Sequence, residues 1–187
     1  MRIVLDDRQV EWVERNAARR NEHARKNNLK SYCGNDTDFT KPKHEMGLAG
    51  ELAVCVAYGT TLNGVLMHEN KVLGAPDCGS FIEVKTSFCP EKVPMSKRSV
   101  YVPLRHLLRM EEIGLSFAFV QCYTTDWRRG LDIAGWQWGS EILKSVPTTQ
   151  PNGYPVKVYP AKDLKSPRAL SLYIKDHDLR VTSPGKL

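Results

Sequence analysis

Hydrophobic and polar residues follow a helical period at the start of the chain. Residues 6–29 contain helix-forming residues without Pro or Gly, and Val10, Val13 and Ala17 form a narrow apolar seam at helical spacing. Polar and charged residues surround this seam, and the second half of the segment is rich in Arg and Lys. The pattern predicts a long and mostly exposed helix.

A second helical pattern follows a polar interruption. Residues 31–43 are punctuated by Gly and Pro, which predicts a loop, and residues 44–59 show the apolar stripe of a helix. Gly47 and Gly50 each weaken a helix relative to Ala, so we expect the sheet or a substrate to approach the helix closely there. Glu51 lies beside them in mid-helix, where an unpaired acid is unfavourable if it is buried.

The middle of the chain changes to patterns that are typical of strands. Residues 98–102 alternate as a strand does, and residues 103–114 predict a helix that ends at a glycine. Residues 115–124 are continuously apolar, which predicts a central strand covered on both faces. Residues 131–144 predict a further strand that turns into a short helix, and the Pro-rich segment after residue 144 gives no clear pattern.

These elements predict an α/β fold, a mixed β-sheet flanked by helices with an N-terminal helical extension. The length of 187 residues and the 41% hydrophobic content allow a core without disulfides, and we expect one domain over residues 1–187. Within this domain we expect a basic helix and loop over residues 1–43, a core over 44–144 and a C-terminal extension over 145–187.

Charge and cysteine content narrow the class of protein. The 27 Lys and Arg residues exceed the 21 Asp and Glu residues, and the net charge of +6 favours polyanionic partners. Charged residues occur near the start of the chain and no apolar run can span a bilayer, so we expect no membrane partner and a cytoplasmic location. The five cysteines are scattered, without a CxxC pair, which predicts reduced thiols.

Candidate chemistry gathers in residues 74–87. Asp77 lies in a turn marked by Gly and Pro, and Glu83 and Lys85 follow in a predicted strand. Side chains two residues apart in a strand point to the same face, so Glu83 and Lys85 share a face. Two acids and one base can therefore converge here, although each residue alone is equally typical of a turn or of a surface ion pair.

The order of these residues resembles the PD-(D/E)XK nuclease superfamily. The resemblance rests on the helix acid Glu51, the Pro-Asp pair at 76–77 and the Glu-Val-Lys triplet at 83–85, and it covers about residues 44–144. The strand and helix that follow are also similar to those of phage and bacterial members. The resemblance implies a restriction-endonuclease-like fold and a Mg²⁺-dependent phosphodiesterase, with Mn²⁺ as a substitute metal.

Each residue of the motif suits a step of phosphodiester hydrolysis. Mg²⁺ prefers oxygen ligands, which the Asp77 and Glu83 carboxylates and the Val84 carbonyl can supply. Lys85 can hold the attacking water or oppose charge on the phosphate. Glu51 can bind a second metal or orient a water. The resemblance thus implies Glu51, Asp77, Glu83 and Lys85 as catalytic residues.

We expect a nuclease that acts on DNA, and the sequence does not exclude RNA as its substrate. No sequence-reading module is visible, which favours structure-directed or end-directed cutting by an endonuclease or exonuclease over sequence-specific cutting. The alternative is a non-catalytic nucleic-acid-binding module with a nuclease-derived fold. An enzyme of small phosphorylated molecules would need a glycine-rich phosphate loop, which the sequence lacks. The candidate phosphate contacts are Arg19, Arg20, Arg25, Lys26, Lys30, Lys92, Lys97 and Arg98.

Overall fold

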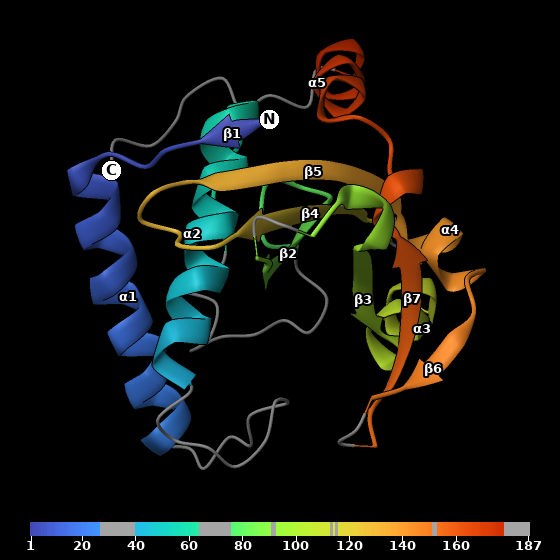
Figure 1. The fold of residues 1–187 in the computed structure, drawn as a ribbon, viewed down its shortest axis with the longest axis horizontal. Helices are drawn as coiled ribbons and strands as arrows, with labels where there is room; N and C mark the ends of the chain where they lie inside the picture. Colours follow the sequence, from blue (N-terminus) through green and yellow to red (C-terminus); the bar gives the residue numbers. More distant parts are fainter. Residues whose placement is uncertain are drawn as a thin grey trace.

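The N-terminal part of the protein forms two long helices that lie side by side. The computed structural model describes residues 1–26, 40–63, 76–90, 93–112, 114, 116–150 and 153–177. Helix α1 spans Asp7–Lys26 and helix α2 spans Thr40–Tyr58 (Figure 1). Helix α2 begins inside the segment that was predicted to be a loop. Pro42 is tolerated there because the amides of the first helical turn have no partner within the helix.

The larger sheet has four strands and mixes parallel with antiparallel pairing. Its strands are β1 (Arg2–Ile3), β2 (Ile82–Phe88), β4 (Ala118–Thr124) and β5 (Leu131–Trp138), in the order β1-β5-β4-β2. Strands β2 and β4 are parallel, and the other two pairs are antiparallel. Every residue of β4 is buried, which confirms the prediction that residues 115–124 contain a central strand.

A second, antiparallel sheet was not predicted. It contains β3 (Ser99–Pro103), β6 (Pro147–Thr149) and β7 (Pro155–Pro160) in the order β3-β7-β6. The segment after residue 144 therefore supplies two strands, of which β7 pairs with β3 of the predicted core and β6 pairs with β7. The α/β class is confirmed, but a single mixed sheet is too simple a description. Prolines at strand ends obscured β6 and β7 in the sequence, because proline is usually depleted in strands.

Three shorter helices complete the described structure. They are α3 (Leu104–Glu112), α4 (Gly139–Leu143) and α5 (Pro167–Asp176), and two 3₁₀ turns span Met95–Lys97 and Ala161–Asp163. The sequence predicted a helix from residue 103, and helix α3 starts at Leu104, directly after the last residue of β3. Among the described residues, no helix combines the length with the apolar character that crossing a membrane requires.

Helices cover the larger sheet on both faces. A side chain at Gly50 of α2 would collide with the Thr86 side chain of β2, so α2 packs directly on the face that carries Thr86. The opposite face carries Phe119 of β4, which lies against α4 at Gly139. The close approach predicted at Gly50 is thus an approach to the sheet, whereas a side chain at Gly47 would meet nothing within 4 Å.

The described cysteines are free thiols in the protein interior. Cys55, Cys78, Cys89 and Cys122 are all buried and none forms a disulfide. Reduced thiols were predicted, and these four residues confirm the prediction; Cys33 lies outside the described residues.

Candidate active site

A tight turn brings Asp77 back against the strand that follows it. Cys78 and Ile82 exchange two backbone hydrogen bonds of 2.9 and 3.1 Å, and Gly79 between them has φ of 56°, a conformation that glycine adopts without strain. The chain therefore reverses, and the Asp77 Oδ2 atom accepts a hydrogen bond of 2.8 Å from the Val84 backbone amide. The turn at Asp77 was predicted; this hydrogen bond was not.

The Asp77 carboxylate lies at the free edge of the larger sheet. Among the strands of the described part of the chain, β2 pairs only with β4, and its other edge is bridged at Ile82 by Cys78 but carries no strand. The Val84 amide bonds Asp77 at that edge, and the N–H and C=O groups of one strand residue point to the same side. The Val84 carbonyl therefore faces the same edge as the Asp77 carboxylate, which suits its predicted part as a third oxygen ligand.

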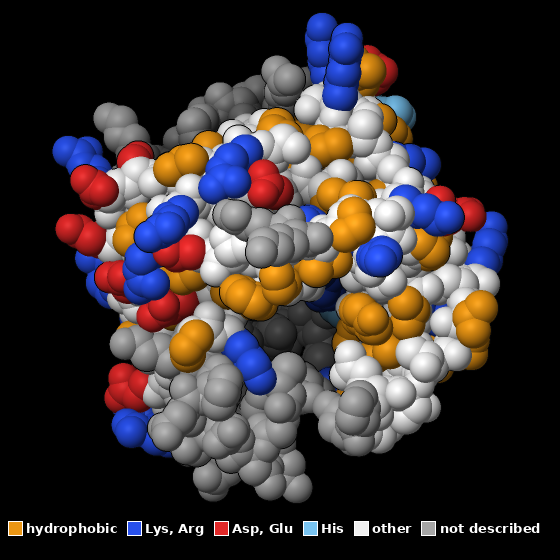
Figure 2. Space-filling model, viewed as in Figure 1, with side chains coloured by type: hydrophobic (Ala, Val, Ile, Leu, Met, Phe, Trp, Pro, Cys, Tyr) orange, Lys and Arg blue, Asp and Glu red, His pale blue; other side chains and the backbone are white. Residues whose placement is uncertain are grey.

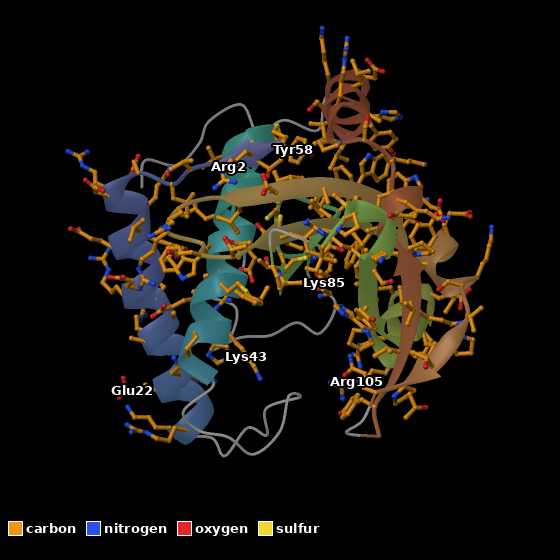
Figure 3. All side chains as sticks on the ribbon, in the orientation of Figure 1. Arg2, Glu22, Lys43, Tyr58, Lys85 and Arg105 are labelled. Carbon is orange, nitrogen blue, oxygen red and sulfur yellow. The ribbon has the colours of Figure 1, made fainter. Side chains whose placement is uncertain are left out.

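Glu83 and Lys85 form a direct ion pair on one face of β2. The Lys85 Nζ atom lies 2.7 Å from the Glu83 Oε1 atom, which confirms that the two side chains share a face. The Glu83 side chain is 6% exposed and that of Lys85 is 25% exposed, so the pair reaches solvent on the lysine side. Figure 2 shows a hollow in this face of the molecule with Lys or Arg atoms at its inner wall, and Figure 3 places Lys85 there.

Burial and neighbouring charges shift the pKa values of Asp77 and Lys85. Burial, followed by the negative charge of Glu83, raises the pKa of Asp77 to about 7, although Lys85 and the Val84 amide act in the opposite direction. Burial alone would lower the pKa of Lys85, but the charges of Glu83 and Asp77 outweigh it and raise that pKa. The neighbouring acids therefore favour the protonated, positively charged form of Lys85.

Glu51 joins this cluster from α2, but it is paired with an arginine of α1. The Arg20 Nη1 and Nη2 atoms donate hydrogen bonds of 3.2 and 2.9 Å to the two Glu51 carboxylate oxygens. Both side chains are about nine-tenths buried. Burial and then the charge of Asp77 raise the pKa of Glu51 to about 7, and the Arg20 charge opposes this shift. The Arg20 guanidinium is thus a largely buried partner of Glu51, and its predicted contact with phosphate stays a prediction.

The other predicted phosphate contacts differ in their exposure and in their bonding partners. Arg19, Arg25, Lys26 and Lys97 are exposed, and Lys26 forms a helical ion pair of 2.8 Å with Glu22. The helix that carries the first three lies on the outer side of α2, away from β3 and α3 (Figure 1). Their predicted part in nucleic-acid binding stays a prediction.

Arg98 is only partly exposed and already has structural partners. Its Nε atom donates a 2.8 Å hydrogen bond to the Val93 carbonyl, and its guanidinium lies 4.9 Å from the centre of the Tyr123 ring. Lys30 and Lys92 lie outside the described residues.

Sequence reasoning missed three residues that lie near the hollow. The His106 Nε2 atom of α3 lies 3.6 Å from the Glu83 Oε1 atom, and its ring meets that of Phe119 edge-on. Lys43 of α2 and Arg105 of α3 extend from the two sides of the hollow (Figure 3). No local pattern marks these residues, because α2, β2 and α3 come together only in the folded chain.

The Asp77 carboxylate and the Val84 carbonyl at the β2 edge are oxygen atoms of the kind that Mg²⁺ prefers. Among the described residues, no group of three or more His, Cys, Asp or Glu side chains is arranged to hold a metal. Mg²⁺ does not need such a group, since one or two carboxylates with water and substrate oxygens can hold it. The raised pKa of Asp77 indicates that its charge lacks full compensation from the protein, as expected of a cation ligand.

Comparisons with protein-family models, with curated proteins and with solved structures give no significant match. The resemblance to the PD-(D/E)XK superfamily therefore rests on the residues of this chain alone. The function has to be argued from the geometry around Asp77, Glu83 and Lys85.

Proposed function

We propose that this protein is a nuclease that hydrolyses phosphodiester bonds in DNA with the help of Mg²⁺. The observation that carries the proposal is the group of Asp77, Glu83 and Lys85, in which the Asp77 carboxylate at the edge of β2 lies within electrostatic reach of the Glu83–Lys85 ion pair on one face of the same strand. A restriction-endonuclease-like core, with the acid-bearing strand at the edge of a mixed sheet, is part of the same proposal.

Each residue of the site has its own role in the proposed hydrolysis. The reaction forms a bond from a water oxygen to phosphorus and breaks the bond from phosphorus to one ester oxygen. The water gives up a proton, and the leaving oxygen takes one up. The Asp77 and Glu83 carboxylates would hold the divalent cation, which would supply Lewis acidity and lower the pKa of a bound water. Lys85 donates hydrogen bonds from a fixed positive charge to the phosphate as negative charge develops on it. The Val84 amide holds Asp77 in position.

The surroundings of the hollow suit an extended polyanion. Lys43 and Arg105 are exposed and come from two different helices, so they can contact backbone phosphates on both sides of the bond that is cut. Contacts to phosphate carry no information on base sequence. We therefore propose structure-directed or end-directed cutting, of DNA before RNA.

A non-catalytic nucleic-acid-binding module is the second candidate. The observation that favours it is the pairing of Glu83 with Lys85 and of Glu51 with Arg20, because each of these acids already has a cation from the chain. In that case the hollow would bind phosphate without cutting, and added metal would change nothing.

A cleavage assay distinguishes the two functions. We expect the protein to cut at least one of linear, circular, nicked and branched DNA in Mg²⁺, and to lose this activity with a chelator. Asp77→Asn should abolish cutting, whereas Asp163→Asn, at an exposed position, should not. Binding of these DNAs without any metal-dependent product would favour the non-catalytic module.

A further inference from the structure

We propose that Arg20 acts as a built-in cation at Glu51, so that the site takes one divalent ion, between Asp77 and Glu83, and Glu51 is not a metal ligand. This inference rests on the proposed function and adds the number of metals. It also makes α1 part of the proposed active site, through the Arg20 side chain.

The geometry of the Arg20–Glu51 pair carries the first step. Both oxygens of Glu51 accept hydrogen bonds from the two terminal nitrogens of Arg20, which is the bidentate arrangement that guanidinium and carboxylate form best. The Arg20 guanidinium cannot lose its proton at any ordinary pH. A divalent ion on the same carboxylate would therefore lie next to a permanent positive charge, and the two cations would repel each other.

Packing fixes the pair in place. The Arg20 side chain is 10% exposed and that of Glu51 is 11% exposed, and the two helices that carry them pack along each other. The Glu51 carbonyl accepts a hydrogen bond of 3.3 Å from the Cys78 thiol, which joins α2 to the turn that holds Asp77. Arg20 is therefore a positioning residue, since it orients Glu51 beside Asp77 without reaching the reacting atoms itself.

The balance of charge gives an independent reason for a single ion. Glu51, Asp77 and Glu83 are three carboxylates and Arg20 and Lys85 are two cations, so the ionised cluster carries one negative charge. One divalent cation and one phosphodiester then make the cluster neutral. Two divalent cations would leave two positive charges in excess, at a site where burial already disfavours unbalanced charge.

Binding of Mn²⁺ alone, measured by calorimetry and by the loss of the free-ion spectrum in electron paramagnetic resonance, tests the inference without any activity. At pH 8 we expect one Mn²⁺ per wild-type chain. Glu51→Gln should still bind one Mn²⁺, with an affinity within about threefold of wild type, whereas Glu83→Gln should weaken binding about 10-fold or more. Arg20→Met frees Glu51 and should add a second, weaker site.

The outcomes separate the inference from the proposed function. Two Mn²⁺ ions per wild-type chain, or a 10-fold loss of affinity in Glu51→Gln, would overturn the single-ion site and leave the nuclease proposal standing. No bound Mn²⁺ in the wild-type chain would overturn both. The count on the wild-type chain and the Glu51→Gln result decide the matter even if Arg20→Met does not fold.

Discussion

Asp77 is an acid whose ionisation the folded protein opposes. Burial and the charge of Glu83 raise its pKa from 3.8 to about 7. Between these two values the folded chain binds more protons at Asp77 than the unfolded chain does, so the free energy of unfolding falls as pH rises through this range. Above pH 7 the ionised carboxyl is a net cost to the fold, which is expected of a residue kept for binding a cation.

Removing this charge should therefore stabilise the protein in a pH-dependent way. Asp77→Asn keeps an oxygen that can accept the Val84 hydrogen bond but carries no charge. In metal-free buffer we expect its melting temperature to exceed that of wild type by about 3 °C or more at pH 8, and by much less at pH 4. Thermal unfolding followed by circular dichroism over this range measures the difference. An unchanged or lower melting temperature at pH 8 would contradict the assignment, and Asp163→Asn gives the baseline.

The individual side chains of the site were only partly predictable. Alternation along a strand was enough to place Glu83 and Lys85 on one face, where they form the observed ion pair. Arg20 and His106 reach the site from other helices, and their contacts depend on how those helices pack. The basic character of α1 suggested a phosphate contact for Arg20, whereas burial makes it the partner of an acid.

The packing of α2 on β2 depends on the absence of a side chain at Gly50. A methyl group there would collide with Thr86, one residue after Lys85 in β2. We expect Gly50→Ala to lower the free energy of unfolding by about 1–3 kcal/mol, because helix and strand must move apart. Gly47→Ala, three residues earlier in open space, should instead be neutral or raise it by about 0.5–1 kcal/mol through helix propensity.

Urea unfolding of the two variants and the wild type checks this pair of predictions. If both alanines have the same effect, close packing at Gly50 is not what restricts this position. A loss of stability in Gly50→Ala should come with weaker binding of Mn²⁺, since the collision lies next to the candidate site.

Helices and strands with a clear hydrophobic pattern were predicted well. Those that form only through contacts with other parts of the chain were not. The apolar seam of α1 and the continuous apolar run of β4 gave the right element type. The start of α2 was placed four residues late because Pro42 is typical of a loop, yet it fits the first turn of a helix. Strands β6 and β7 are short and begin with proline, so only their pairing with each other and with β3 identifies them.

The complete site uses more of the chain than the motif does. The resemblance covers about residues 44–144, but Arg20 comes from α1, before this range. The second sheet combines β3 with strands from beyond it, and β3 leads directly into α3, which carries His106 and Arg105. A fragment limited to the motif range would therefore lack a partner for Glu51 and the strand β7 that pairs with β3. The second sheet thus combines residues of the predicted core with residues of the predicted C-terminal extension.

The central claim is that Lys85 stabilises charge on a phosphate that is being cut. Lys85→Ala removes this charge while the acids remain, so catalysis should suffer far more than binding. Lys144 offers a matched control, because it forms a comparable ion pair of 2.8 Å with Glu141 at an exposed position. Since Glu83 is buried and loses its lysine partner in Lys85→Ala, the rates should be measured well below the melting temperature of that variant.

The most direct measurement is the single-turnover rate of DNA cleavage in saturating Mg²⁺, taken together with the affinity for the same DNA in Ca²⁺. We expect Lys85→Ala to lower the rate by about 10²–10³-fold and to change the affinity by less than about threefold. Lys144→Ala should change neither quantity. A Lys85→Ala variant that is folded and cuts DNA at the wild-type rate would contradict the assignment of this site as a nuclease active site.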